Sequence, residues 1–285
     1  MLSFGIMQGR LTPSKNRGIQ FFPFENWQKE FYDAIEIGLN EIEWIFDYEK
    51  YEENPIFTDA RRLRVRETVA NTGIKINSIC FDYFMRVPFY KIQGDEKNKM
   101  FSENCEMTYR VLNSLAELGG RLLEIPMVDN SSVKTIEEEK MAVEYVQKSA
   151  EMASEFGIKI GLETDFPPGK FKKFLESIGG KYVYANFDSG NSSGLGYDAL
   201  EEIGSLKERI YNVHIKDRVY QGTTVKLGTG SADFNKVFSA LKEVGYQNSF
   251  ILQAARGEDG KEKDNIVQQL NFVKEYLARY HIGDE

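Results

Sequence analysis

Four side chains in the second half of the chain can bind a metal ion or move a proton, and each follows a short apolar run. Glu163 follows Gly-Leu, Asp188 follows Asn-Phe, His214 follows Asn-Val and Gln253 follows Ile-Leu. Successive members are 25, 26 and 39 residues apart, and each interval can hold one strand and one helix. Carboxylate oxygens and a neutral imidazole suit Mn²⁺, Zn²⁺, Co²⁺ or Mg²⁺. The pattern therefore predicts one divalent metal ion between Glu163, Asp188 and His214.

Such a site needs elements that bring these side chains together. Short apolar runs bounded by Gly, Asn, Asp or Pro predict eight buried parallel strands. They cover residues 2–7, 41–46, 75–80, 121–126, 159–164, 183–188, 210–215 and 249–254. Apolar residues at helical spacing predict helices over about 25–37, 136–156 and 233–244. A glycine that can end a helix comes before five of the strands, at Gly38, Gly73, Gly119, Gly157 and Gly245.

This alternation continues over 285 residues with no linker or change in composition. We therefore expect an α/β fold, a single (β/α)8 TIM barrel that forms one domain over residues 1–285. An open doubly wound sheet is the alternative, but no Gly-x-Gly-x-x-Gly follows the first strand. Function in a barrel concentrates at the C-terminal ends of the strands, where all four side chains would meet.

Composition excludes some classes of partner. The net charge is −8, from 36 basic and 44 acidic residues, which argues against nucleic-acid binding. No apolar run approaches the roughly 18 residues needed to span a membrane. The N-terminal stretch lacks the basic start of a signal peptide, so we expect a cytoplasmic protein. Cys80 and Cys105 are expected to be reduced thiols.

Several short motifs, in order along essentially the whole chain, resemble the xylose-isomerase-like TIM barrel superfamily, in particular its sugar phosphate isomerase/epimerase branch. They are GIMQGR at 5–10, IEW at 42–44, GLE at 161–163, FDSGN at 187–191, VHIKD at 213–217 and LGTG at 227–230. The resemblance implies metal ligands from strands five to eight: a Glu, an Asp, a His and a second Glu. Members of this branch often pair through their helical exterior, so a homodimer is among the expectations.

The chain departs from the family pattern at the fourth ligand. Glu163, Asp188 and His214 match, but Gln253 stands where the second Glu is expected, and Asn191 stands where many members have a His. Gln253 can still offer its amide oxygen to a metal, but it cannot take up a proton. The resemblance therefore implies Glu163 as the general base, with Gln253 as the altered catalytic position and fourth ligand.

Further polar residues fall at or just beyond the predicted strand ends. Arg10 and Arg256 could hold a phosphate or carboxylate, and Lys216 would act as a point charge. Glu43 could orient a sugar hydroxyl, and the turn at 228–231 could cradle an anion or supply Ser231 as a helix N-cap. The expected substrate-binding residues are Gln8, Arg10, Glu43, Asn191, Lys216, Asp217 and Arg256.

These expectations define a metal-dependent isomerase or epimerase of a small sugar or sugar phosphate, with proton transfer next to a polarised carbonyl. Two alternatives stay open. One is a dehydratase (lyase) of a keto-polyol on the same metal site. The other is a sugar-binding protein whose catalysis is impaired because Gln253 replaces the second Glu. An apurinic-site endonuclease is excluded, because that activity uses many histidines and this acidic chain has only His214 and His281.

Overall fold

The computed structural model describes residues 2–92 and 94–283, and its centre is a ring of parallel strands. The strands close into a barrel in the order β1-β10-β7-β6-β5-β4-β3-β2. They are β1 (Ser3–Met7), β2 (Glu41–Ile45), β3 (Ser78–Cys80), β4 (Leu122–Met127), β5 (Lys159–Thr164), β6 (Val183–Asp188), β7 (Ile210–Ile215) and β10 (Ser249–Leu252). The predicted (β/α)8 barrel is confirmed.

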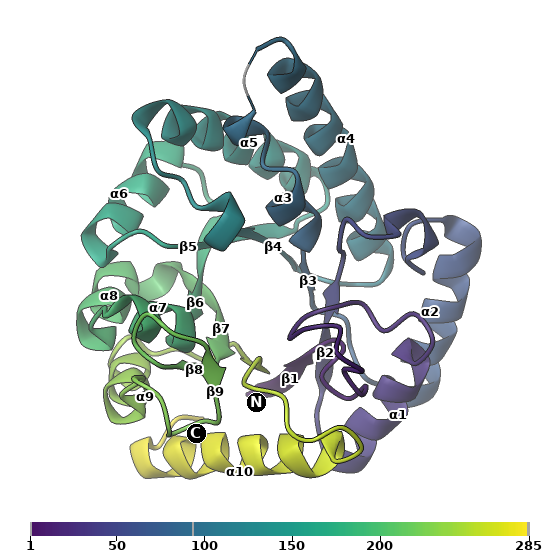
Figure 1. The fold of residues 1–285 in the computed structure, drawn as a ribbon, viewed down its shortest axis with the longest axis vertical. Helices are drawn as coiled ribbons and strands as arrows, with labels where there is room; N and C mark the ends of the chain where they lie inside the picture. Colours follow the sequence, from purple (N-terminus) through teal and green to yellow (C-terminus); the bar gives the residue numbers. More distant parts are fainter. Residues whose placement is uncertain (1, 93, 284–285) are drawn as a thin grey trace.

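Helices surround the ring of strands on the outside (Figure 1). They are α1 (Trp27–Ile37), α2 (Asp59–Thr72), α3 (Asp82–Arg86), α4 (Glu96–Glu117), α5 (Ile136–Glu155), α6 (Pro168–Ile178), α7 (Ser189–Leu195), α8 (Ala199–Leu206), α9 (Phe234–Glu243) and α10 (Glu262–Tyr280). Short 3-10 turns and one small hairpin complete the described chain: η1 (Tyr51–Glu53), η2 (Phe89–Lys91), η3 (Asp129–Ser131), η4 (Lys207–Arg209), and β8 (Asp217–Arg218) paired with β9 (Thr224–Val225).

Two predicted strands, at 75–80 and 249–254, are shorter in the structure by more than one residue. The run predicted at 75–80 pairs regularly only from Ser78, and Lys75 makes an isolated bridge to Glu41. The last strand ends at Leu252, one residue before Gln253. The backbone N–H of Gln253 still donates to the carbonyl of Ile215 at 3.0 Å, so its position at the barrel rim is fixed.

All five predicted helix-ending glycines have a positive φ, between 67° and 85°. Gly38 illustrates the reason. At φ 85° its N–H donates to the carbonyls of Ala34 and Ile35, which closes the last turn of α1 and directs the chain into β2. A residue with a side chain would be strained in this left-handed conformation.

The strand register brings the predicted ligands to one level of the barrel. Asp188 on β6 pairs directly with His214 on β7. His214 in turn pairs with Ile251 on β10, two residues before Gln253. Because all these strands are parallel, their C-terminal ends share one rim.

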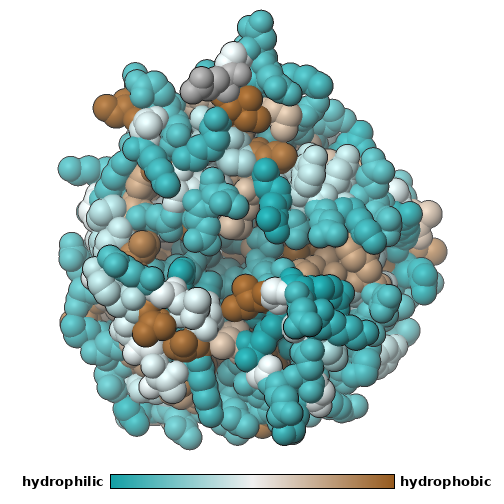
Figure 2. All heavy atoms as spheres, in the orientation of Figure 1, coloured by the Kyte–Doolittle hydropathy of each residue, from teal (hydrophilic) through white to brown (hydrophobic). Residues whose placement is uncertain are grey.

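Apolar side chains fill the space between strands and helices as one continuous core. The face seen in Figure 1 is mostly hydrophilic, with hydrophobic residues only in small groups (Figure 2). In the described ranges, no helix has the length and apolar character needed to cross a bilayer.

Candidate active site

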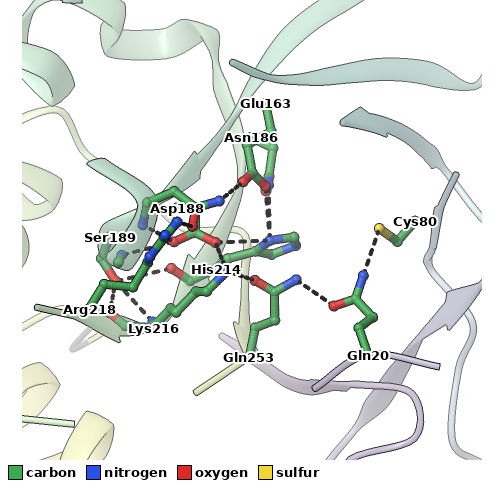
Figure 3. Close-up of polar contacts among 12 residues, drawn as sticks. Gln20, Cys80, Glu163, Asn186, Asp188, Ser189, His214, Lys216, Arg218 and Gln253 are labelled. Atoms are coloured by element: carbon green, nitrogen blue, oxygen red, sulfur yellow. Dashed lines mark hydrogen bonds and ion pairs between the residues drawn. The ribbon is translucent and has the colours of Figure 1, made fainter. Parts of the chain in front are cut away.

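Glu163, Asp188 and His214 meet at the C-terminal ends of β5, β6 and β7 (Figure 3). One ligand atom from each lies within 4.8 Å of the others, and all three residues are buried. His214 Nδ1 is 3.4 Å from Glu163 Oε2 and 3.9 Å from Asp188 Oδ2. The ring nitrogen therefore faces both carboxylates, as the predicted metal site requires.

The other nitrogen of His214 contacts Glu43 on β2. Nε2 is 2.7 Å from Glu43 Oε1, and Glu43 Oε2 accepts hydrogen bonds from Ser78 Oγ at 2.6 Å and Asn212 Nδ2 at 2.9 Å. Both Glu43 and His214 are fully buried. Metal-binding histidines usually have such a carboxylate on their second nitrogen, which fixes the ring and leaves the first nitrogen for the ion.

Asp188 has one oxygen for structure and one for the site. Oδ1 accepts from the N–H groups of Gly190 at 2.8 Å and Asn191 at 2.7 Å, so it caps α7. Oδ2 faces His214 and Lys216. A Cβ at Gly190 would lie 2.6 Å from Lys216 Cγ and 2.9 Å from its backbone carbon, so glycine allows α7 to start this close to β7.

Glu163 is held at both oxygens by amide groups. Asn186 Nδ2 donates to Oε2 at 2.8 Å, and Asn191 Nδ2 donates to Oε1. Arg218 Nη1 donates to Asn191 Oδ1 at 3.0 Å, which orients that amide. The predicted base therefore has a fixed position, and Asn191, predicted to bind substrate, contacts the base directly.

Gln253, at the predicted fourth ligand position, contacts Lys216. Lys216 Nζ lies 3.3 Å from Gln253 Oε1 and 3.4 Å from Asp188 Oδ2. Gln253 Nε2 donates to Gln20 Oε1 at 3.2 Å, and Gln20 Nε2 donates to Asp82 Oδ2 at 2.6 Å. A chain of polar contacts therefore runs from Asp188 across Gln253 to the loop that precedes α1 (Figure 3).

The donor set fits a divalent ion. Two carboxylates and one imidazole within 4.8 Å of one another are suitable ligands for metal–ligand bonds of roughly 2.0–2.2 Å. Burial alone would lower the pKa of His214, but the carboxylates of Glu43 and Glu163 raise it well above its ordinary value. The site therefore favours positive charge at this ring. Lys216 and Asn186 contact the same ligand atoms, so an ion competes with them.

A cavity of about 240 Å³ opens onto the site at the rim. This is below the roughly 300–1,000 Å³ typical of drug-sized ligand pockets, so it suits a small ligand. Of the predicted residues, its lining contains Glu163, Asn191, Lys216 and Gln253. A larger cavity of about 490 Å³ lies at the opposite end of the barrel, but the charged residues in its lining are Lys75 and Arg121, which are not a ligand set for a metal cation.

Several polar residues of the lining were not predicted as site residues, among them Gln20, Asp82 and Glu124. Glu124 could have been found as the one acidic residue inside the apolar run Leu-Leu-Glu-Ile-Pro, and Asp82 as a carboxylate two residues after β3. Gln20 gave no such signal, because it lies in an irregular loop far from the ends of strands. Burial raises the pKa of Asp82 to about 6 and that of Glu124 well above its usual range.

Five predicted substrate-binding residues lie outside this lining. Gln8 Oε1 accepts from the N–H of Ile45 at 3.1 Å. Arg10 and Arg256 both donate to the carbonyl of Ile19, and Arg256 also donates to that of Thr12 at 3.0 Å. These guanidinium groups fix the loop after β1. Glu43 lies outside the lining as well, behind His214.

Asp217, the fifth of these residues, is buried at the start of β8, and its carboxylate contacts the turn that follows the β8–β9 hairpin. Oδ2 accepts from the N–H groups of Gly228 at 2.9 Å and Gly230 at 2.8 Å, and Oδ1 accepts from that of Ala232 at 3.1 Å. The turn at 228–231, predicted to bind an anion, therefore binds the Asp217 carboxylate of this chain. The prediction of Ser231 as an N-cap is wrong, because Asp233 caps α9 by accepting from the N–H of Lys236.

The fold and this site are those of a barrel enzyme with a candidate metal centre. Residues 31–276 match the family model described as xylose isomerase-like TIM barrel, and the chain belongs to this family. The family predicted from the motifs is therefore confirmed.

Curated relatives and solved structures of sugar epimerases resemble the chain over most of its length. L-ribulose-5-phosphate 3-epimerase UlaE of Salmonella heidelberg is 24% identical over 270 residues, covering 89% of this chain and 91% of that protein. UlaE of Shigella flexneri is 23% identical over 234 residues, covering 77% and 78%. The structure of D-allulose 3-epimerase from Methylomonas sp. has a TM-score of 0.77 at 17% identity, covering 97% and 98%. The predicted class, an isomerase- or epimerase-type enzyme, agrees with these relatives.

Proposed function

We propose that this chain is a metal-dependent sugar epimerase that moves a proton at a carbon next to the carbonyl of a ketose. The observation that carries the proposal is the group of Glu163, Asp188 and His214 at the C-terminal rim of a barrel of this family. Relatives named as epimerases of ribulose phosphate and allulose support the same reaction class.

Glu163, Asp188 and His214 would hold the divalent ion, and the amide oxygen of Gln253 completes the donor set. When bound, such an ion polarises a carbonyl and so acidifies the neighbouring C–H. Glu43 keeps the His214 ring in place through its 2.7 Å contact with Nε2. Asp188 is held through its two backbone hydrogen bonds in α7.

Glu163 is the residue that takes the proton. Asn186 and Asn191 hold its two oxygens, so the carboxylate is oriented before a substrate arrives. Burial raises the pKa of Glu163, but His214, Lys216 and Asn191 hold it below its usual range, so it is ionised and ready to accept a proton.

Gln253 orients its neighbours and carries no acid–base proton. Its amide binds Lys216 on one side and Gln20 on the other. Glu163 alone is sufficient for isomerisation, in which one base removes and returns the proton. Inversion of a stereocentre needs a second proton carrier on the opposite face, a role that Lys216, which contacts Gln253 and lines the pocket, could take.

The test is hydrogen exchange with Mn²⁺-loaded protein and a panel of ketoses in D₂O, followed by NMR. We expect deuterium at the carbon next to the carbonyl and the appearance of an epimer or isomer. Glu163→Gln should reduce exchange by at least 100-fold, since a positioned base contributes about 10²–10⁴. Asp47→Asn changes another carboxylate of the pocket lining and should retain activity.

Loss of water with a new enone absorbance would contradict the proposal and support the dehydratase alternative. Exchange that is the same for wild type and Glu163→Gln would exclude Glu163 as the base. Sugar binding without exchange, even after Gln253→Glu, would support the non-catalytic alternative.

A further inference from the structure

Glu124 on β4 is a buried carboxyl group that lines the pocket, and no described residue makes a regular hydrogen bond to either of its oxygens. It is fully buried. The nearest group that can donate is the thiol of Cys80, which is a weak donor and also donates to Asp82 Oδ1 at 3.3 Å. An unpaired buried carboxyl is costly, and buried polar groups in proteins almost always have a partner. A ligand in the pocket is the partner that its position allows.

Asp82 and Gln20 lie on the same side of the pocket as Glu124. Figure 3 shows Gln20 and Cys80 on the other side of Gln253 from Asp188 and Lys216. Gln20 connects Gln253 to Asp82 by two hydrogen bonds, so the metal-ligand side and this second side are joined by one polar network. A small ligand held at Glu163 can therefore extend towards Asp82 and Glu124.

The charge of the lining argues against a phosphate group at that end. The cavity is lined by five acidic residues and two basic ones. The basic residues are already paired, Lys216 with Asp188 and Gln253, and Arg86 with Asp47 at 3.8 Å. Arg10 and Arg256, predicted as phosphate ligands, donate to backbone carbonyls outside the lining. A phosphate dianion here would face five acidic side chains, and both basic residues of the lining are already paired, whereas a hydroxyl group can donate to a carboxylate and accept from a carboxylic acid.

We propose that Glu124 and Asp82 form a subsite for the tail hydroxyl groups of the substrate, so that the substrate is an uncharged ketose rather than a sugar phosphate. This inference rests on the proposed function and narrows its substrate class. It distinguishes this chain from the relatives named for L-ribulose 5-phosphate.

A second metal ion is the other ligand that Glu124 could receive, since Glu43, Cys80 and Glu124 also have ligand atoms within 4.8 Å. Glu43 argues against it. Its Oε1 contacts His214, and its Oε2 accepts from Ser78 and Asn212. Both oxygens are therefore in use, which leaves too few ligands for a closed site.

The experiment compares L-ribulose, its 5-phosphate and its 5-deoxy analogue on the Mn²⁺-loaded protein. Exchange in D₂O gives kcat/KM, and calorimetry gives binding. We expect both kcat/KM and the association constant to be at least 10-fold higher for L-ribulose than for L-ribulose 5-phosphate. Glu124→Leu should lower kcat/KM for L-ribulose about 10-fold or more, mainly by raising KM. It should lower kcat/KM for the 5-deoxy analogue much less. Glu124→Gln, which keeps one donor and one acceptor, should retain part of the activity.

A substrate subsite and a purely structural role for Glu124 predict different effects on stability. If Glu124 binds the substrate, replacing this buried, unpaired carboxyl with an apolar group should raise the unfolding midpoint while binding weakens. A variant that loses stability and loses activity equally with all three ligands would overturn the subsite. Preference for the phosphate, or two tightly bound Mn²⁺ ions per chain, would also overturn it. If no ketose shows exchange, the proposed function fails. Calorimetry still decides in that case whether the pocket prefers the free sugar or the phosphate. If the protein binds neither of them, the subsite is overturned.

Discussion

His214 is oriented by a residue that is 171 positions away in the sequence and is not part of the pocket lining. Glu43 was predicted to orient a sugar hydroxyl, but the structure places it against Nε2 of His214. Its carboxylate is fully buried and accepts two further hydrogen bonds, so it cannot turn towards a ligand. At the scale of single residues, the site therefore depends on a support that holds the ligands as much as on the ligands themselves.

Glu43→Gln tests this support. The amide keeps an acceptor for His214 but loses the charge, so the ring becomes a weaker ligand. We expect the Mn²⁺ dissociation constant to rise about 10- to 100-fold, measured by titration. Ser78→Ala is the matched control, because Ser78 donates to Glu43 without contacting His214. Equal effects of the two substitutions would show that Glu43 acts only through packing.

At the scale of elements, α7 is the short helix that Asp188 caps at its N-terminus and that carries the Asn191 amide. Its other side is attached to α8, where Ser192 donates a hydrogen bond to the buried carboxyl of Glu202. Burial raises the pKa of Glu202 to about 7, against an ordinary value of 4.5. The contact between α7 and α8 should therefore depend on pH.

The direction in which the free energy of unfolding changes with pH follows from which state binds the proton. Between pH 4.5 and about 7, the unfolded chain has released the Glu202 proton and the folded chain retains it, so the free energy of unfolding falls as pH rises through this window. The full effect is about 3 kcal/mol at 1.36 kcal/mol per pKa unit. Glu202→Gln should remove this part of the pH dependence and gain stability relative to wild type between pH 5 and pH 8. Urea denaturation at both pH values measures it.

The control for this comparison is Glu201→Gln, which changes an exposed carboxylate in the same turn of α8. It should leave the pH dependence as in wild type. If Glu202→Gln and wild type lose stability in parallel between pH 5 and pH 8, the Glu202 carboxyl is not the group that titrates.

At the scale of the whole molecule, the barrel closes where β1 pairs with β10, which joins the two ends of the chain. The helix α10 follows this strand and packs along the barrel with Ile266, Leu270, Val273 and Leu277 buried. These residues belong to the same core as Trp27 and Trp44 near the N-terminus. The barrel should therefore lose its structure as a unit.

Leu270→Ala should destabilise the protein by about 2–5 kcal/mol, because it leaves a cavity in a closely packed core. Far-ultraviolet circular dichroism reports all helices, whereas tryptophan fluorescence reports only α1 and β2. We expect the two urea midpoints to shift together. Val267→Ala, on the exposed side of the same helix, should cost far less. A shift in the dichroism midpoint alone would show that α10 unfolds separately.

Much of the architecture could be predicted from local patterns. Apolar runs located the strands within a few residues, and the helix-ending glycines were all correct because their left-handed conformation is a local requirement. Glu163, Asp188 and His214 were predicted to meet because parallel strands end at one rim. The structure brings them together, and their role in metal binding stays a prediction.

The polar residues of the loops could not be assigned in this way. Arg10, Arg256 and Asp217 have types suited to ligand binding, yet they bind the backbone of this chain. A charged side chain at a rim can face the pocket or support a loop, and the sequence pattern is the same in both cases. Loop geometry decides which of the two occurs.

The sequence by itself determined the order of strands and helices, the barrel class and the three residues that come together at its rim, because these follow from periodicity and strand position. The tertiary structure decided which other groups reach that rim. Glu124 shows the difference: within its strand it is one polar residue in an apolar run, and only closure of the barrel puts its unpaired carboxyl into the pocket. Burial and partners are properties of contacts between distant segments, so they are settled only when the ring of strands is complete.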